Sequence, residues 1–134
     1  MDCIFCKIAA GELPSFKVYE DEDTLAFLDI RPANYGHTLV IPKKHLVNLE
    51  EVDEKVLCQV MGTVKKVGRA IKAGLGAAGY NVMENNDPVA GQIVPHLHFH
   101  VVPRKENDGL KPWPQGRYNE GEAEYILKKI KSAI

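Results

Sequence analysis

The run PHLHFHVVPR, residues 95–104, alternates histidine with apolar side chains through its first half. Because successive side chains of a strand point to opposite faces, His96, His98 and His100 share one face and the residues between them share the other. The apolar face must be covered by a core, so the pattern predicts a strand from His96 to Val102 within a sheet. The imidazoles repeat roughly every 7 Å along such a strand, close enough to serve one polar pocket.

A second strong pattern is the recurrence of apolar residues at three- and four-residue steps from Asp53 to about Lys72, which predicts an amphipathic helix. Two shorter helices are expected at 2–10 and 120–134. Runs rich in β-branched and aromatic residues between polar or Pro/Gly breaks predict the other strands. These strands are 16–20, 24–30, 36–41 and 80–84. The chain is therefore expected to form a single domain, 1–134, with helices packed on a sheet of about five strands.

The composition excludes several classes of protein. With 45% hydrophobic residues, 26% charged residues and a net charge of -1, the 134-residue chain is expected to be globular without disulfides and not to bind nucleic acid. The first residues, MDCIFCKIAAGELP, have no long apolar core, so no signal peptide or membrane span is predicted and a cytoplasmic location is expected. In that compartment Cys3 and Cys6 are candidates for metal ligation or packing, and Cys58 is expected to be a small core residue.

Three adjacent imidazoles point to chemistry rather than to packing alone. Their proximity disfavours joint protonation and tunes the individual pKa values. On the residues alone, two functional classes stay open: a metal site built from imidazoles, or a nucleophile with acid and base helpers.

Together with its surroundings, the triad resembles the signature of the histidine triad (HIT) family, in which three histidines alternate with apolar residues. The similarity extends through CIFCKI near the start, LAFLDIRPANYGHTLVIPKKH in the middle, and Asn85 and Gly91-Gln92 ahead of the triad. The resemblance implies an α+β fold with a five-stranded antiparallel sheet, two main helices and a homodimer. It also implies the branch of small purine-nucleotide phosphoramidases and dinucleoside polyphosphate hydrolases.

The resemblance assigns the central histidine, His98, as the nucleophile that attacks the α-phosphorus and becomes nucleotidylated before water releases the nucleotide. A neutral imidazole is nucleophilic near pH 7 and its phosphoramidate is labile, so one difficult displacement is divided into two easier steps. His100 would hydrogen-bond the phosphate oxygens that gain charge in the transition state. His37 would lie beside the phosphate site and support His98.

Other positions correspond to family residues that bind the nucleotide. Asn85 and Gln92 would contact the α-phosphate, and the Gly91-Gln92-Ile93 backbone would donate N–H groups to the same oxygens. Asp29 would accept hydrogen bonds from the ribose hydroxyls, with a turn residue at a strand end as the alternative. The residues expected to wall the purine base, unless they serve only as core, are Ile4, Phe5, Ile8, Phe27 and Leu28.

Two departures from the family pattern leave the leaving group open. Some phosphoramidases carry serine after the Gly-Gln pair, where this chain has Ile93, and the segment around Trp113 resembles a region that varies within the family. A nucleotidyltransferase is the alternative activity, but related uridylyltransferases end the motif in glutamine where His100 stands here, which favours hydrolysis. A nucleotide-binding interaction protein with weak catalysis is the third possibility.

The resemblance implies that the pair Cys3-x-x-Cys6 belongs to a metal site. Family members with this pair bind structural zinc through both thiolates, a histidine after the Lys-Lys of the central strand, and the first histidine of the triad. The corresponding residues here are Cys3, Cys6, His45 and His96. Two sulfurs and two nitrogens suit tetrahedral Zn²⁺ with no open position, which implies a structural ion. No cofactor is expected to be required for catalysis.

Overall fold

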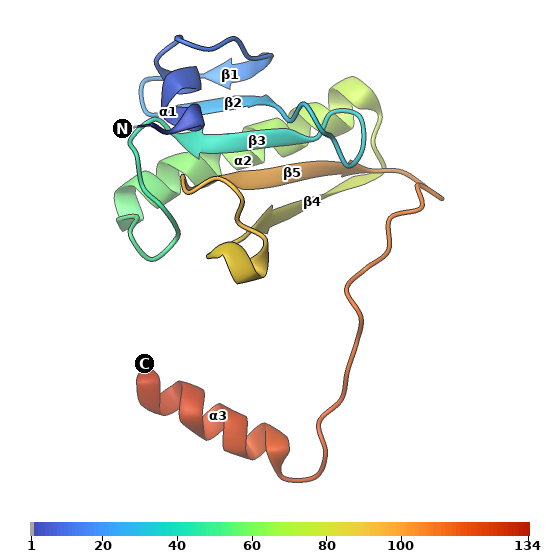
Figure 1. Ribbon diagram of the computed structural model, residues 1–134. Coiled ribbons are helices and arrows are strands. Elements are labelled where there is room, and N and C mark those ends of the chain that lie inside the picture. Colours follow the sequence, from blue (N-terminus) through green and yellow to red (C-terminus); the bar gives the residue numbers. More distant parts are fainter. Residues whose placement is uncertain (1) are drawn as a thin grey trace.

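In the computed structural model, which describes residues 2–134, one antiparallel sheet organises the chain (Figure 1). Its strand order is β1-β2-β3-β5-β4. The strands are β1 (Lys17–Glu20), β2 (Thr24–Leu28), β3 (Thr38–Pro42), β4 (Gly79–Glu84) and β5 (Phe99–Arg104). The helices are α1 (Ile4–Ala9), α2 (Glu54–Leu75) and α3 (Glu122–Ala133), with one 3-10 turn, η1 (Pro88–Ala90). The predicted α+β fold with five antiparallel strands is confirmed.

The two faces of the sheet are covered by different helices. Ala26 of β2 and Val40 of β3 pack in a cluster with the apolar stripe of α2, whereas Leu25 and Phe27 pack in a second cluster with α1. Because both faces are buried, β2 and β3 consist of apolar and threonine side chains without the polar alternation of a half-exposed strand. This arrangement holds the middle strands rigidly at the centre of the molecule.

The long helix α2 begins and ends where local chemistry dictates. The carboxylate of Asp53 accepts a hydrogen bond from the backbone N–H of Val56 at 2.8 Å, which caps the N-terminus. Gly76 ends the helix with a φ of 65°, one turn beyond the predicted end at Lys72. Cys58 lies on the exposed side of α2, so the prediction that it is a core residue was wrong.

The strand predicted over 96–102 begins at Phe99 instead. The ladder with β4 stops at Phe99 because β4 ends there, at Glu84, and the ladder with β3 also stops at Phe99, opposite Val40, although β3 continues to Pro42. The backbone N–H of Leu97 donates to the carbonyl of Leu46, at 2.6 Å, in the loop after β3. The predicted start was therefore wrong, and His96 and His98 lie in the segment that leads into β5. The other predicted boundaries agree with the structure to within three residues.

The last helix stands apart from the rest of the chain. After β5, an irregular arm descends past β4, and α3 lies beyond that edge of the sheet (Figure 1). No residue of α3 is buried. Among the described residues, none of the helices combines the length and the apolar character that crossing a bilayer requires.

Candidate active site and metal site

His98 is the imidazole whose surroundings best fit a nucleophile. Its Nδ1–H donates to the carbonyl oxygen of His96 at 2.7 Å, so a neutral ring carries its lone pair on Nε2. Burial lowers the pKa of His98 and favours that neutral form. Within residues 2–134, Nε2 of His98 makes no hydrogen bond. A fully enclosed Nε2 would therefore be a buried polar atom without a partner, and the only side-chain atom of that kind in these residues is an oxygen of Glu84. Nε2 of His98 therefore has no partner within residues 2–134 and is not fully enclosed.

The ring of His98 is held by aromatic neighbours. The Phe5 ring of α1 meets it edge-on, with centroids 5.2 Å apart, and the His100 ring lies at 5.0 Å. Only 7% of His98 is exposed. Packing thus fixes the ring while Nε2 stays accessible, which is the arrangement an oriented nucleophile needs.

His100 receives a hydrogen bond from a buried histidine of the segment before β3. The backbone N–H of Ala33 donates to Nδ1 of His37 at 3.0 Å, so the proton of neutral His37 must lie on its Nε2. That Nε2–H donates to Nδ1 of His100 at 2.9 Å. Because Nδ1 of His100 is then an acceptor, its proton lies on Nε2. The chain of donors from Ala33 through His37 therefore makes His100 a donor through Nε2.

Burial sets the protonation of this pair. It lowers the pKa of His37, against an opposing effect of Asp29. The pKa of His100 falls to about 4, first through burial and then through the charges of His98 and His37. Both rings are consequently neutral near pH 7. The structure joins His37 to His100 by a hydrogen bond, whereas the sequence suggested that it supports His98.

Asp29 lies at the end of β2, next to this pair. Its Oδ1 accepts from the backbone N–H of Arg31 at 2.8 Å, and its Oδ2 is 3.7 Å from Nε2 of His37. Ligand atoms of Asp29, His37 and His100 lie within 4.8 Å of one another. Since both nitrogens of His37 are used in the donor chain, this cluster is a hydrogen-bonded network rather than a metal site. Asp29 serves as a turn residue and also presents a carboxylate near the histidines.

The loop between β4 and β5 brings Asn85 and Gly91 together. Gly91 has a φ of 100°, which favours glycine, and a Cβ there would be in ordinary contact with Asn85, 3.4 Å from its Nδ2. Ile93 is exposed. Gln92 is buried, and both groups of its side-chain amide form hydrogen bonds with the backbone of nearby loops. Its Oε1 accepts from Asp87 N at 2.9 Å, and its Nε2 donates to Val47 O at 2.6 Å.

The residues expected to wall a purine base cluster around α1. Phe5 and Phe27 meet edge to face, with centroids 5.5 Å apart, and both are buried together with Ile8. Ile4 is half-exposed, and Leu28 is partly buried at the end of β2. Core packing explains Phe5, Phe27 and Ile8, while Ile4 remains available to a ligand.

The four predicted metal ligands converge behind the histidine segment. Nδ1 of His96 lies 3.5 Å from Sγ of Cys3 and 3.6 Å from Sγ of Cys6, and Nδ1 of His45 lies 3.3 Å from Sγ of Cys6. A tetrahedral ion with Zn–S of about 2.3 Å and Zn–N of about 2.0–2.1 Å separates its S and N ligands by about 3.5 Å. The Nε2–H of His96 donates to the carbonyl of Pro42 at 2.8 Å, which leaves its Nδ1 lone pair facing the thiols. The donor set therefore fits zinc.

Two features near the site were missed by the sequence analysis. Glu84, at the end of β4, has an enclosed Oε1 without a partner in residues 2–134, and burial raises its pKa. Asp108 accepts hydrogen bonds from Arg104 at 2.7 Å and from Asn34 at 3.0 Å, which ties the start of the C-terminal arm to the sheet. A carboxylate directly before Asn85 was visible in the sequence, but nothing there indicated its burial.

Known proteins similar to this chain agree in fold and sequence. A family model described as HIT domain matches residues 10–107. Adenosine 5'-monophosphoramidase of Schizosaccharomyces pombe is 41% identical over 136 aligned positions, covering 100% of this chain and 99% of that protein. The crystal structure of a HIT family member from Bacillus subtilis has a TM-score of 0.92 at 41% identity, covering 100% and 98% of the two chains. A Zn-bound histidine triad family protein from Mycobacterium smegmatis has a TM-score of 0.79 at 38% identity, covering 100% and 99%. With its matched segment, its sheet and its triad all in agreement, the chain belongs to the HIT domain family.

Proposed function

We propose that this protein hydrolyses purine nucleoside phosphoramidates or dinucleoside polyphosphates at the α-phosphorus, through a covalent nucleotidyl intermediate on His98. The observation that carries the proposal is the bond from Nδ1–H of His98 to the carbonyl of His96, which leaves an accessible lone pair on Nε2. The relative from S. pombe is named adenosine 5'-monophosphoramidase, which supports a nucleotide hydrolase. Two displacements then release the nucleotide.

In the first displacement, Nε2 of His98 forms a bond to the α-phosphorus while the bond from phosphorus to the leaving amine or phosphate breaks. The leaving group takes the bonding electron pair and is protonated from solvent. In the second, water attacks the phosphorus, the N–P bond breaks, and the electron pair returns to Nε2 as the water loses a proton. The hydrogen bond to His96 O holds the ring through both steps and stabilises the charge on the substituted imidazole.

His100 is proposed to stabilise the developing charge on the phosphate oxygens. Its Nε2–H is fixed by the chain of hydrogen bonds from Ala33 through His37, so no ring has to change its tautomer during the reaction. Asn85 and the backbone of Gly91, Gln92 and Ile93 are proposed to bind the same phosphate. The Gln92 side chain would act by shaping the loop, because its amide is already bonded to the backbone.

The nucleoside is proposed to lie between Asp29, which would accept hydrogen bonds from the ribose hydroxyls, and the apolar surface around α1. Asp29 is partly exposed and lies beside the His37–His100 pair. Ile4 is half-exposed above the buried Phe5, Ile8 and Phe27, and Leu28 adjoins Asp29. A purine base on this surface would put its α-phosphate near His98.

Zinc is proposed to bind Cys3, Cys6, His45 and His96 as a structural ion. The support is the match between the observed S···N distances, 3.3–3.6 Å, and the edges of a tetrahedral site. Two reduced thiols suit a reducing compartment, so we propose a cytoplasmic location. Elemental analysis of purified protein should find one zinc per chain, Cys3→Ser should remove it and lower the melting temperature, and Cys58→Ser should change neither.

A homodimer is also proposed, and the two sheet edges support it. At the β1 edge, the pairing with β2 is interrupted between Lys17 and Tyr19, and the charged Lys17 and Glu20 discourage further strand pairing. The β4 edge has the sequence GYNVME, without lysine or proline, and pairs with β5 in an unbroken register. The β4 edge is therefore free to pair with β4 of a second copy around a two-fold axis.

The test of function is hydrolysis of adenosine phosphoramidate and diadenosine polyphosphates, with AMP measured as a product. The wild-type protein should release AMP, and His98→Ala should lose nearly all turnover while keeping its melting temperature within a few degrees. Turnover in His98→Ala equal to that of the wild type would reject the proposed role. Added sugar phosphate should not capture the nucleotide, whereas a nucleotidyl sugar product would indicate a transferase.

A further inference from the structure

An enclosed carboxyl group lies next to the proposed phosphate loop, residues 85–92, and takes no part in the two displacements described above. Glu84 is the last residue of β4 and pairs with Phe99, which packs in the cluster formed with the apolar stripe of α2. Directly opposite residues of an antiparallel pair project from the same face of the sheet, so Glu84 lies on the face that α2 covers. A carboxyl group on such a face is costly unless hydrogen bonds replace its lost hydration. Its partners therefore indicate what it does.

Within the part of the chain that the structure describes, the carboxyl group of Glu84 has one hydrogen-bond partner. Its Oε2 accepts from Nδ2 of Asn86 at 2.5 Å, while its Oε1 is enclosed without a partner. Oδ1 of Asn86 in turn accepts from the backbone N–H of Leu49 at 2.9 Å. Glu84 therefore orients the side-chain amide of Asn86, and that amide ties the start of the phosphate loop to the segment that follows β3.

Asn85 lies between the two residues of this pair. Because the side chains of Glu84 and Asn86 are joined, the backbone of Asn85 has fewer conformations available to it. The Asn85 amide is next to Gly91, at the far end of the same loop, where an added Cβ would lie 3.4 Å from its Nδ2. The direction of the Asn85 side chain thus depends on the pair that flanks it.

The other end of the loop is anchored to the same segment. Nε2 of Gln92 donates to the carbonyl of Val47 at 2.6 Å, and its Oε1 accepts from the backbone N–H of Asp87 at 2.9 Å. Asp87 has a φ of 73° and a ψ of 153°, a conformation that is unfavourable for a residue with a side chain. Such a conformation persists only where surrounding contacts hold it. The loop is therefore held in one shape by hydrogen bonds at both of its ends.

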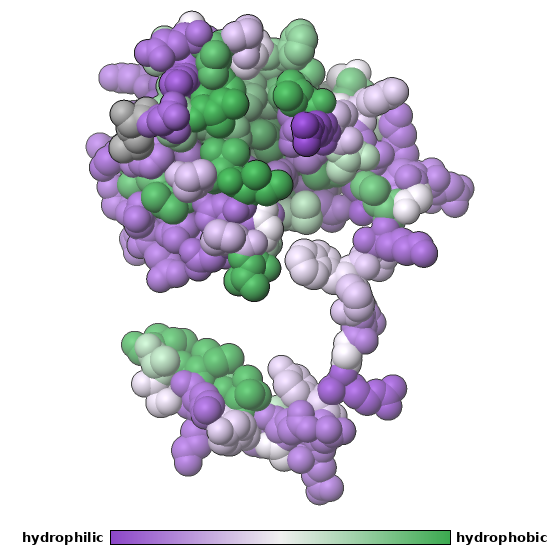
Figure 2. Space-filling view, in the orientation of Figure 1, coloured by the Kyte–Doolittle hydropathy of each residue, from purple (hydrophilic) through white to green (hydrophobic). Residues whose placement is uncertain are grey.

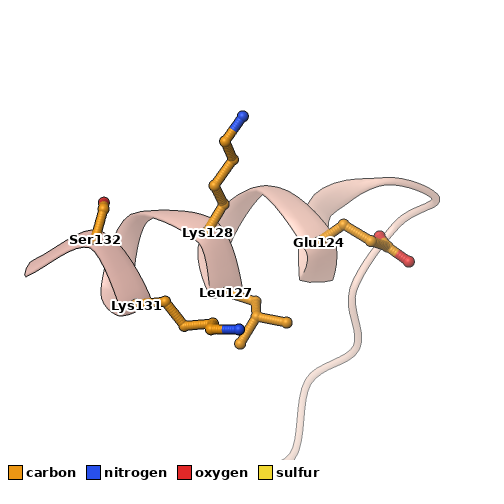
Figure 3. Close-up of a pocket in the computed structure, with 5 residues that line it drawn as sticks. All are labelled: Glu124, Leu127, Lys128, Lys131 and Ser132. Carbon is orange, nitrogen blue, oxygen red and sulfur yellow. The ribbon is translucent and has the colours of Figure 1, made fainter. Parts of the chain in front are cut away.

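Packing does not restrain the loop from outside. No residue of η1 is buried, and Val89 is fully exposed. Figure 2 shows open space between the main body and α3 of the same chain, so this helix does not cover the loop. The side chains that line the hollow on α3, among them Glu124 and Lys128, come from α3 alone (Figure 3). The hydrogen bonds to residues 47–49 are therefore the main restraints on the loop.

We propose that Glu84 and Asn86 are positioning residues for hydrolysis: Glu84 orients the amide of Asn86, and Asn86 holds the loop on Leu49 so that Asn85 points at the α-phosphate. This inference rests on the proposed function, in which Asn85 binds that phosphate. Neither Glu84 nor Asn86 touches the substrate. Their effect is on geometry, because a polar group stabilises a transition state only when it is already in place.

Steady-state hydrolysis of adenosine phosphoramidate by matched variants tests the proposal. Glu84→Leu keeps a side chain of similar size and removes the acceptor for Asn86. Its kcat should fall about fivefold to a hundredfold, because a misplacement of about 1 Å can lower a rate about a hundredfold, and its KM should change little. Glu84→Gln retains an oxygen acceptor and should keep kcat within about threefold of the wild type. Glu20→Leu removes a hydrogen-bonded carboxylate from the end of β1, at the other edge of the sheet, and should leave kcat unchanged.

A double variant shows whether Glu84 acts through Asn86. In Asn86→Ala, kcat should fall at least as far as in Glu84→Leu, because the N–H of Leu49 also loses its acceptor. Adding Glu84→Leu to Asn86→Ala should then lower kcat by less than about twofold, since the group through which Glu84 acts is already gone. A wild-type kcat in Glu84→Leu, or losses that multiply in the double variant, would overturn the proposal.

Hydrogen exchange gives a readout that needs no substrate. The backbone N–H groups of Asp87, Ala90, Gly91 and Gln92 all donate hydrogen bonds within the loop. In Glu84→Leu they should exchange about tenfold faster than in the wild type, whereas amides in the middle of α2 should exchange at the wild-type rate. Unchanged exchange in the loop would show that the pair does not hold it and would overturn the proposal. Failure of the proposed function would appear instead as a wild-type protein that releases no AMP, so the two failures are told apart on the same samples.

Discussion

Replacement of His37 tests whether this buried ring acts through His100. In His37→Leu, the ring that fixes the proton of His100 on Nε2 is lost, and the Ala33 N–H loses its acceptor. A neutral hydrogen bond contributes about 1 kcal/mol, or about fivefold in rate. Complete loss of an oxyanion donor costs about 2.7–4 kcal/mol, or about a hundredfold or more. We therefore expect kcat to fall about tenfold to a hundredfold, with little change in KM.

The matched variant His37→Gln separates this role from simple packing. The amide N–H of glutamine can still donate to Nδ1 of His100, although the acceptor for Ala33 is altered. Steady-state kinetics on adenosine phosphoramidate should show that His37→Gln loses less activity than His37→Leu. On a logarithmic scale, the decrease in kcat from the wild type should be at most half as large in His37→Gln as in His37→Leu. Equal kcat values in the two variants, or a loss confined to KM, would show that the donor chain has no part in the reaction.

Three further outcomes follow from the structure. The pKa of His100 falls from 6.5 to about 4 on folding, so as the pH is lowered the unfolded state binds a proton on His100 before the folded state does. The contribution of His100 to the free energy of unfolding should be complete above about pH 6.5 and should decrease from there down to about pH 4. Thermal unfolding of His100→Asn should show a smaller decrease in stability over the same pH range. Gly91→Ala should destabilise the fold by about 1–2 kcal/mol in urea unfolding, because its φ of 100° is unfavourable for alanine. Gly74 lies in the last turns of α2, and no atom lies near the methyl group that alanine would add there. Gly74→Ala should therefore stabilise the fold by about 0.5–1 kcal/mol. A change of stability with the same sign in Gly91→Ala and Gly74→Ala would contradict the explanation from backbone conformation.

Periodic patterns in the sequence predicted the sheet and α2 well, because burial on one face or stripe leaves a repeat that can be read directly. The start of β5 could not be predicted in the same way. Residues 96–98 continue the alternation, but β4 ends opposite Phe99, and β3, which runs on to Pro42, does not pair with them. Strand length depends on neighbouring strands that lie far away in the sequence, and the alternation contains no information about them.

The same distinction applies to the candidate site: local sequence patterns could be recognised, and contacts between distant residues could not. The triad and the two cysteines could be recognised from residue type and spacing, and the structure brings Cys3 and His96 to within 3.5 Å. The link from His37 to His100 could not be predicted, because 63 residues separate the two rings and only the sheet brings them into contact. The hydrogen bond from the Gln92 amide to the carbonyl of Val47 could not be predicted either, because it depends on how two loops pack against each other.

The most direct measurement is the mass of the protein and its peptides after rapid quenching of the reaction with a purine nucleoside phosphoramidate. Attack by Nε2 predicts one added nucleotidyl group, located on the peptide that contains His98 and absent from His98→Ala. Turnover at the wild-type rate with no adduct at any quench time, or an adduct located on His100, would contradict the assignment of His98 as the attacking residue.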